Sequence, residues 1–225
     1  MAPFPLQVDT VVLDVDGTLV DSNYHHTLAW WQSFHERGRQ VPAWRIHRAI
    51  GMGGDRLVAA VAGDEAEHEI GDDVRDGWEH HYDRHLDDIV PLPGAKDLLA
   101  DLDARGFRVA LASSGIPRHT AHAQEVLEAA DRVTTSTTSE DAEESKPAPE
   151  LLEVALDRID ATHAVLVGDS VWDVRSAANA GLPVIALLCG GFGRAELEDA
   201  GATIVLEDVE ELRARLDELV VSKTS

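Results

Sequence analysis

The chain has 225 residues, 44% of them hydrophobic, which is enough for one sizeable core domain with or without a small second domain. Its 42 acidic residues outnumber 19 basic ones, and the net charge of −23 argues against nucleic acid or an anionic membrane as a partner. A single cysteine, Cys189, allows no internal disulfide, and no apolar stretch is long enough to cross a membrane, so we expect a cytoplasmic protein.

The acidic surplus has two explanations. A GC-rich genome favours Asp and Ala, and Arg over Lys, whereas molar salt in the cytoplasm screens self-repulsion beyond about 3 Å and tolerates such a charge. We favour the second explanation, a halophilic origin. Because like-charged surfaces repel, we expect a monomer or a weak homodimer. Lys is rare in this chain, which makes Lys146 easy to single out.

The first predicted element is a buried, apolar strand over Val8–Leu13 that delivers two carboxylates at its end. Asp14 and Asp16 follow it directly, and buried carboxylates are costly unless a cation or a reaction uses them. In open α/β sheets, ligands bind at the C-terminal ends of the strands. Gly17 lets the backbone leave the strand sharply, so Asp14 and the chain that follows can face one small site.

The sequence pattern of residues 21–90 predicts helices and no strand. Ser22, with Asp21, is typical of a helix N-cap, and Leu28, Trp31 and Phe34 have helical spacing. The predicted segments are Tyr24–Gly38, Ala43–Ile50, Asp55–Ala62 and Glu65–Leu86. Glycines at Gly51–Gly54 and Gly63 separate them.

After Pro91 the pattern changes to alternating helices and strands, which favours a parallel sheet covered on both faces. The predicted strands are Phe107–Ala112, Arg132–Thr135, Ala164–Val167, Pro183–Leu188 and Thr203–Leu206. The predicted helices are Ala95–Arg105, Arg118–Ala130, Pro147–Ile159, Val171–Ala180, Arg194–Ala200 and Val209–Val220, with 221–225 expected to fray. The fold class is therefore α/β, a Rossmann-like doubly wound sheet. We expect a core domain at 1–20 and 91–225 and an α-helical cap domain at 21–90, inserted after the first strand.

Four polar features occur at the ends of strands or just before helices. They are Asp14-x-Asp16-Gly17-Thr18, the run Ser113-Ser114-Gly115, Lys146 ahead of a helix, and Gly168-Asp169 with Asp173 four residues after that Asp. In this order they resemble the haloacid dehalogenase-like hydrolase superfamily over nearly the whole chain. The resemblance includes the branch of capped phosphatases, phosphoglycolate phosphatases and β-phosphoglucomutases.

The resemblance implies a role for each residue. Asp14 would be the nucleophile and Asp16 the general acid/base, while Ser113 and Lys146 would hold the transferring phosphoryl group. The metal ligands would be Asp14, Asp16 through its backbone carbonyl, and Asp169, with Asp173 supporting the metal through water. The cofactor would be Mg²⁺, and the partner a small phosphorylated metabolite.

Elementary chemistry agrees with these roles. Converging carboxylates repel one another, and all-oxygen ligation suits Mg²⁺. A carboxylate can attack phosphorus to give an aspartyl-phosphate, which divides one difficult step into two. General acid/base work by Asp16 favours a moderately raised pKa.

Simpler interpretations stay open for some residues. Ser113 or Ser114 could only cap a helix, and Asp173 could only complete a capping box with Ser170. Cys189 fits a core or strand-end position better than a nucleophile. The insert should supply specificity, and its candidates for substrate binding are His26 and Arg48, with Ser113, Ser114 and Lys146 from the core.

Three functions compete. The first is a Mg²⁺-dependent phosphatase acting through an aspartyl-phosphate. The second is a phosphosugar mutase of the β-phosphoglucomutase type, but those enzymes carry an acidic residue where this chain has Gly168, and the arginine of their cap loop has Gly54 as its nearest match here. The third is a non-catalytic module that binds phosphate or a partner, which an intact set of charged residues disfavours.

Overall fold

The computed structural model describes residues 4–223, and its centre is a six-stranded sheet in which every strand runs parallel to its neighbours. The strand order is β4-β3-β2-β5-β6-β7, so β2 lies inside the sheet and the order reverses there. In open α/β sheets such a reversal marks the ligand site. The strands are β2 (Thr10–Leu13), β3 (Arg108–Ala112), β4 (Thr135–Thr137), β5 (Ala164–Gly168), β6 (Val184–Leu187) and β7 (Ile204–Leu206).

Two apolar cores lie on opposite faces of this sheet, because alternate strand residues point to opposite sides. Leu13 and Val167 belong to one core and Val12 and Leu166 to the other. The first core is covered by α5 (Ala95–Ala104), α6 (Pro117–Val126), α10 (Val209–Ala214) and α11 (Leu216–Leu219), and the second by α7 (Glu150–Asp157), α8 (Val171–Asn179) and α9 (Arg194–Ala200). The predicted α/β class is confirmed.

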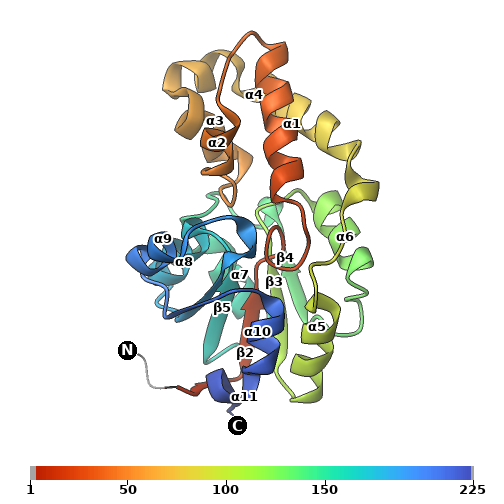
Figure 1. Cartoon of the computed structure of the whole chain (residues 1–225), viewed down its shortest axis with the longest axis vertical. Helices are drawn as coiled ribbons and strands as arrows, with labels where there is room; N and C mark the ends of the chain where they lie inside the picture. The colour runs from red at the N-terminus through yellow and green to blue at the C-terminus, as the bar shows by residue number, and fades with distance from the viewer. Residues whose placement is uncertain (1–3, 224–225) are drawn as a thin grey trace.

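A group of helices lies beyond the C-terminal ends of the strands (Figure 1). It comprises α1 (Asn23–Glu36), α2 (Ala43–His47), α3 (Gly54–Ala62), α4 (Asp64–Asp83) and the short 3₁₀ turn η1 (Leu86–Asp88). Helix α1 packs along α4, where the rings of Trp30 and Trp78 stack with centroids 4.9 Å apart. Between residues 4 and 223, no helix has both the length and the apolar character that a membrane crossing requires.

The buried face of α1 differs from the predicted one. Leu28 is 47% exposed and Trp31 39% exposed, whereas Trp30 and His26 are buried. Phe34 is fully buried, and it belongs to the predicted face as well as to the face that is actually buried. The spacing of apolar residues predicted the helix correctly, but the face that α1 turns inward is set by α4 and by the polar site beneath it.

The two ends of the described chain also differ from expectation. The first strand is interrupted at Asp9, whose carboxylate accepts hydrogen bonds from Thr10 and Thr162 and pairs with Arg108. The preceding residues form β1 (Leu6–Val8), which pairs in parallel with β8 (Val220–Ser222). Fraying was therefore a wrong prediction for 221 and 222, and 224–225 lie outside the described residues.

Three other boundaries need correction. Strand β4 begins at Thr135, where the predicted strand ended, because its three residues pair with Ala110–Ala112. Helix α7 begins at Glu150, after the prolines that were expected in its first turn. The predicted last helix is broken at Arg215, whose φ of −113° departs from helical geometry.

Candidate active site

Asp14 lies directly after β2, one of the two central strands of the sheet, where the chain bends. The Asp14 N–H donates to the Val167 carbonyl at 2.9 Å, which keeps the loop in line with β5. Gly17 has a φ of +79°, and a Cβ on it would lie 2.1 Å from the Asn23 side chain. Only glycine fits both requirements, so the turn predicted from Gly17 has a geometric reason.

Lys146 enters this site from the segment that precedes α7. Its side chain is 1% exposed, its ammonium pairs with Asp14, and it lies 2.7 Å from Asp173 Oδ1. Burial lowers the pKa of Lys146, but the charges of Asp14 and Asp173 outweigh it and raise the pKa. The ammonium therefore stays charged, as a group that holds an anion must.

Asp169 is held by two side chains from the loop after β2 and the start of α1. The Thr18 hydroxyl donates to Oδ1 at 2.7 Å, and Asn23 Nδ2 donates to Oδ2 at 2.9 Å. A Cβ on Gly190 would lie 1.7 Å from Asp169 Oδ2. The contacts of Thr18, Asn23 and Gly190 with Asp169 were not predicted. Thr18 is part of the motif that begins at Asp14, but nothing in the local sequence around Asn23 or Gly190 indicates a place in the site.

Oxygen atoms of three buried carboxylates, Asp14, Asp169 and Asp173, lie within 4.8 Å of one another. Burial raises the pKa of Asp14, and the charge of Asp173 adds to this effect. The same two causes raise the pKa of Asp169 to about 7. One lysine cannot balance three carboxylates, and a divalent cation with oxygen ligands fits the donor set that remains.

Asp16 points away from this cluster. Its Oδ1 accepts from the Ser22 hydroxyl at 2.7 Å and from His26 Nε2 at 3.1 Å. The indole of Trp78 donates to His26 Nδ1 at 3.2 Å, so Nδ1 accepts and Nε2 carries the proton toward Asp16. Burial would raise the pKa of Asp16, but the hydrogen bonds from His26 and Ser22 and the charge of Lys146 lower it, so the moderately raised pKa expected for acid/base work is not found in this arrangement. Ser22 therefore occupies the predicted N-cap position without making a cap bond to the helix.

The serines after β3 divide between two positions. Ser113 is buried; its Oγ accepts from the Gly115 N–H at 3.0 Å and lies 3.4 Å from Asp16 Oδ2. Ser114 faces the cavity, and its hydroxyl lies 3.4 Å from the Gly51 carbonyl. Asp173 both completes the capping box of α8 and pairs with Lys146, so the two readings of this residue are compatible.

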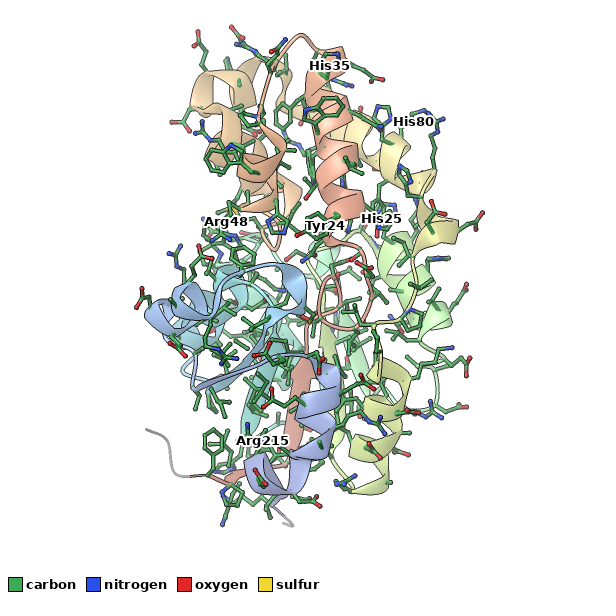
Figure 2. All side chains as sticks on the ribbon, viewed as in Figure 1. Tyr24, His25, His35, Arg48, His80 and Arg215 are labelled. Carbon is green, nitrogen blue, oxygen red and sulfur yellow. The ribbon has the colours of Figure 1, made fainter. Side chains whose placement is uncertain are left out.

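Arg48 is not brought into the site. Its guanidinium pairs with Glu196 and lies 4.1 Å from the ring centroid of Phe192, at the lower end of the helical group (Figure 2). Arg48 does not line the cavity, and its contact with substrate stays a prediction. Cys189 is half-buried, and its thiol donates to the Gly17 carbonyl at 3.1 Å, as a packing residue does.

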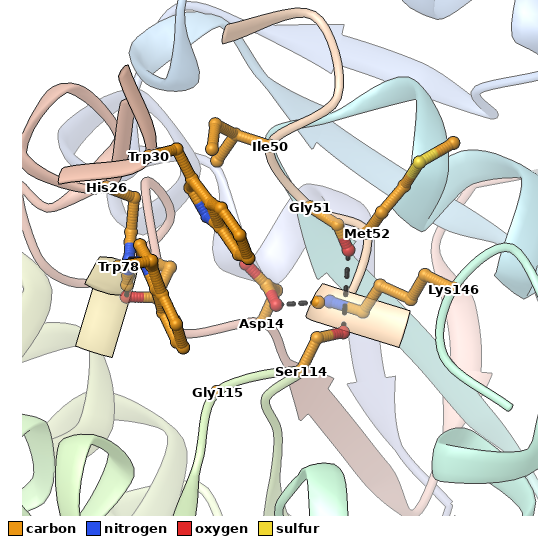
Figure 3. Close-up of a pocket in the computed structure, with 12 residues that line it drawn as sticks. Asp14, His26, Trp30, Ile50, Gly51, Met52, Trp78, Ser114, Gly115 and Lys146 are labelled. Carbon is orange, nitrogen blue, oxygen red and sulfur yellow. Dashed lines mark hydrogen bonds and ion pairs between the residues drawn. The ribbon is translucent and has the colours of Figure 1, made fainter. Parts of the chain in front are cut away.

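A cavity of about 50 Å³ lies over these residues (Figure 3). Asp14, Asp16 and Lys146 line it. The rest of its wall includes His26, Trp30 and Trp78 from helices α1 and α4, and Ile50 and Met52 from the loop between α2 and α3. Its volume suits a few water-sized groups, or one phosphoryl group.

The family model of haloacid dehalogenase-like hydrolases matches residues 8–181, more than half of the sequence, and the chain belongs to this family. It is 32% identical over 213 residues to phosphoglycolate phosphatase of Rhodospirillum rubrum, covering 88% of this chain and 86% of the relative. It is 23% identical over 215 residues to pyrophosphatase PpaX of Oceanobacillus iheyensis, covering 92% and 96%.

Among solved structures, a hydrolase from Pseudomonas syringae superimposes with a TM-score of 0.88 at 31% identity, covering 92% of this chain and 97% of the other. The expectation of a haloacid dehalogenase-like hydrolase of the phosphatase type is confirmed. The separate roles of Asp14, Asp16, Ser113, Lys146 and the remaining site residues stay predictions.

Proposed function

We propose that the protein is a Mg²⁺-dependent phosphatase that hydrolyses a small phosphorylated metabolite through an aspartyl-phosphate on Asp14. The observation that carries this proposal is the buried set of Asp14, Asp169 and Asp173 around Lys146, beside a cavity that Asp14, Asp16 and Lys146 line. Such a set is expensive to bury, and a reaction that uses it explains why it is there.

In the first step, a carboxylate oxygen of Asp14 attacks phosphorus and the alcohol oxygen of the substrate leaves. Asp16 gives that oxygen a proton. In the second step, water attacks the phosphorus of the aspartyl-phosphate, Asp16 takes the proton of that water, and Asp14 leaves as a carboxylate. The lowered pKa of Asp16 suits the second step, and the negative charge of a bound phosphate would raise that pKa for the first.

Lys146 and Ser113 would hold the phosphoryl oxygens. The Asp14 and Asp169 carboxylates, with Asp173 in support and the Asp16 backbone carbonyl, would hold Mg²⁺, which neutralises charge on the carboxylates and on the phosphoryl group. His26, hydrogen-bonded to Asp16 and to Trp78, would fix the direction in which Asp16 points.

Residues 21–90 would act as a cap that excludes water from the reaction. Supporting this, His26, Trp30 and Trp78 of that segment line the cavity together with Asp14. We also propose that the enzyme acts in the cytoplasm as a monomer or a weak homodimer, as its charge and single cysteine suggest.

Hydrolysis is favoured over phosphosugar mutase activity by the surroundings of Gly168. Phosphosugar mutases of the β-phosphoglucomutase type carry an acidic residue at the position of Gly168. A Cβ on Gly168 would lie 2.6 Å from the Asp173 Cβ, so such a side chain does not fit unless Asp173 moves.

The test is hydrolysis of p-nitrophenyl phosphate with and without Mg²⁺, in low and high KCl, by the native protein and by Asp14→Asn. We expect metal-dependent turnover that falls by about 10³-fold or more in the variant. Turnover that is unaffected by Asp14→Asn would contradict the proposal. A non-catalytic module would show no turnover and no Mg²⁺-dependent binding of fluoroberyllate.

A further inference from the structure

A second, larger cavity opens directly beside the first. It measures about 250 Å³ against about 50 Å³, and the two share Gly54, Trp78 and Ser114 in their walls. It lies between α3 and α4 on one side and the segment from Ser139 to Ser145 on the other. If a phosphoryl group occupies the small cavity, this adjoining space receives the alcohol part of the substrate, so the inference below rests on the proposed function.

Three carboxylates line the larger cavity: Asp55, Glu79 and Glu143. Glu79 pairs with Arg118, while Asp55 lies 3.8 Å from the Arg56 guanidinium and accepts a hydrogen bond from the Ser145 N–H at 3.2 Å. Glu143 is exposed, and its carboxylate makes no ion pair or hydrogen bond with any residue between 4 and 223. The cavity therefore has hydrogen-bond acceptors at its solvent-facing rim, and at Glu143 a negative charge that no basic side chain offsets.

The one basic residue in the lining cannot offset these charges. Arg75 uses Nη1 to donate to the Gly54 carbonyl at 3.0 Å and to Glu67 at 3.1 Å. Its Nη2 donates to Glu67 and to Asp72, both at 2.8 Å. Four of the five guanidinium N–H groups are thus occupied, and two carboxylates neutralise the charge. Among residues 4–223, no basic side chain in this lining is therefore free to pair with a substrate carboxylate.

We infer that this enzyme selects phosphate esters whose alcohol part carries no negative charge and presents hydrogen-bond donors, such as the hydroxyls of a polyol or sugar. Hydroxyl groups can donate to Asp55 and Glu143, and the ring of Trp78 gives an apolar wall against which the carbon skeleton packs. An alcohol bearing a carboxylate would instead meet like charges with no compensating donor. The selectivity therefore differs from that of the relatives named phosphoglycolate phosphatase.

The experiment compares two nearly isosteric pairs of substrates: 2-hydroxyethyl phosphate with 2-phosphoglycolate, and glycerol 3-phosphate with 3-phosphoglycerate. Each pair differs by a hydroxymethyl group against a carboxylate. At low ionic strength, where charges are least screened, we expect kcat/KM to be larger for the hydroxyl member by about tenfold or more. Equal or faster hydrolysis of the carboxylate members would overturn the inference.

The responsible residues are tested with the double variant Asp55→Asn/Glu143→Gln. It should raise kcat/KM for the two carboxylate substrates and reduce the preference for the hydroxyl member in both pairs by about tenfold. The matched control is Glu198→Gln on the exposed surface of α9, which should leave both ratios as they are.

An unchanged ratio in the double variant would remove Asp55 and Glu143 as the cause and overturn the inference. The failure of the proposed function has a different signature: p-nitrophenyl phosphate would then not be hydrolysed in an Asp14-dependent way, and the inference would fall with it.

Discussion

The Lys146 ammonium pairs with two buried carboxylates, and its removal tests how far it offsets their negative charge. In Lys146→Met, Asp14 and Asp173 lose their partner, and breaking a buried pair costs about 3–5 kcal/mol. We expect this loss in the free energy of urea unfolding without divalent ions, together with loss of turnover. Added Mg²⁺ should recover part of the stability, because it restores positive charge to the cluster.

The matched control for that substitution is Lys96→Met. Lys96 pairs with Glu128 at the surface, where the two side chains are 39% and 70% exposed, so its loss should change stability by less than about 1 kcal/mol. Similar effects of the two substitutions would show that the Lys146 ammonium does not balance the buried cluster.

His26 is expected to position Asp16. In His26→Gln, the ring N–H whose hydrogen bond helps to lower the pKa of Asp16 is removed, so that pKa rises. The acidic limb of the pH profile for p-nitrophenyl phosphate hydrolysis should then move to higher pH, and kcat should fall by about 10–100-fold with little change in KM. Trp78→Phe, which removes the N–H that orients His26 together with part of the indole ring but leaves His26 in place, should shift the acidic limb less. A limb that stays in place in both variants would exclude the positioning role.

At the scale of elements, the turn after β6 reaches the site through Gly190, within the 3₁₀ turn η3 (Leu188–Gly190). Its backbone approaches Asp169 so closely that Gly190→Ala must displace that carboxylate. We expect a higher Mg²⁺ concentration for half-maximal activity, by about 10-fold or more. The control is Gly193→Ala, since a Cβ there meets only the flexible end of Glu196, at 3.1 Å. Equal Mg²⁺ requirements in the two variants would contradict the prediction.

Helices α4 and α6 meet at a buried histidine that should make stability depend on pH. Burial lowers the pKa of His119, although its hydrogen bond with Asp83 at 2.8 Å opposes this. The neutral ring is thus favoured in the folded state. Its contribution is fully present above the unfolded pKa of about 6.5 and is lost as pH falls through the lower folded value.

Buried carboxylates such as Asp169 act in the opposite direction over this range, so the comparison is between the native protein and His119→Gln. Between pH of about 7.5 and about 5.5, we expect the urea midpoint to change less favourably in the native protein than in His119→Gln. His68→Gln, on the exposed surface of α4, should keep the native response. The same change of midpoint in the native protein and in His119→Gln would refute the argument.

Elements and site residues could be predicted from the sequence to different degrees. Apolar runs and alternating helix signals gave the parallel sheet, and the carboxylates at strand ends gave Asp14 and Asp169. Asn23 and Trp78 could not be found in this way, because they reach the site only through the packing of α1 and α4. Helix α1 shows the same limit. The spacing of its apolar residues predicted a helix, but the face that is buried depends on the packing of α1 against α4.

At the scale of the whole molecule, one charge distribution bears on both function and stability. The acidic excess includes carboxylates around the larger cavity as well as on the outer surface of α4. Arginines neutralise some of them, as Arg75 and Arg118 do on α4. The remaining charges repel one another and any anionic ligand, so salt is expected to affect stability and substrate selection together.

That repulsion gives the last prediction. If it dominates over the ion pairs, the thermal midpoint measured by circular dichroism should rise from low salt to molar KCl, because salt screens like charges. A double variant, Asp73→Asn/Asp76→Asn, removes exposed acids from the middle of α4, each worth about 0.2–0.5 kcal/mol of repulsion. Its midpoint should be about 1–3 °C higher at low salt and respond less to KCl. A native midpoint that stays level or falls with KCl would contradict the halophilic interpretation and favour genome composition as the source of the acidity.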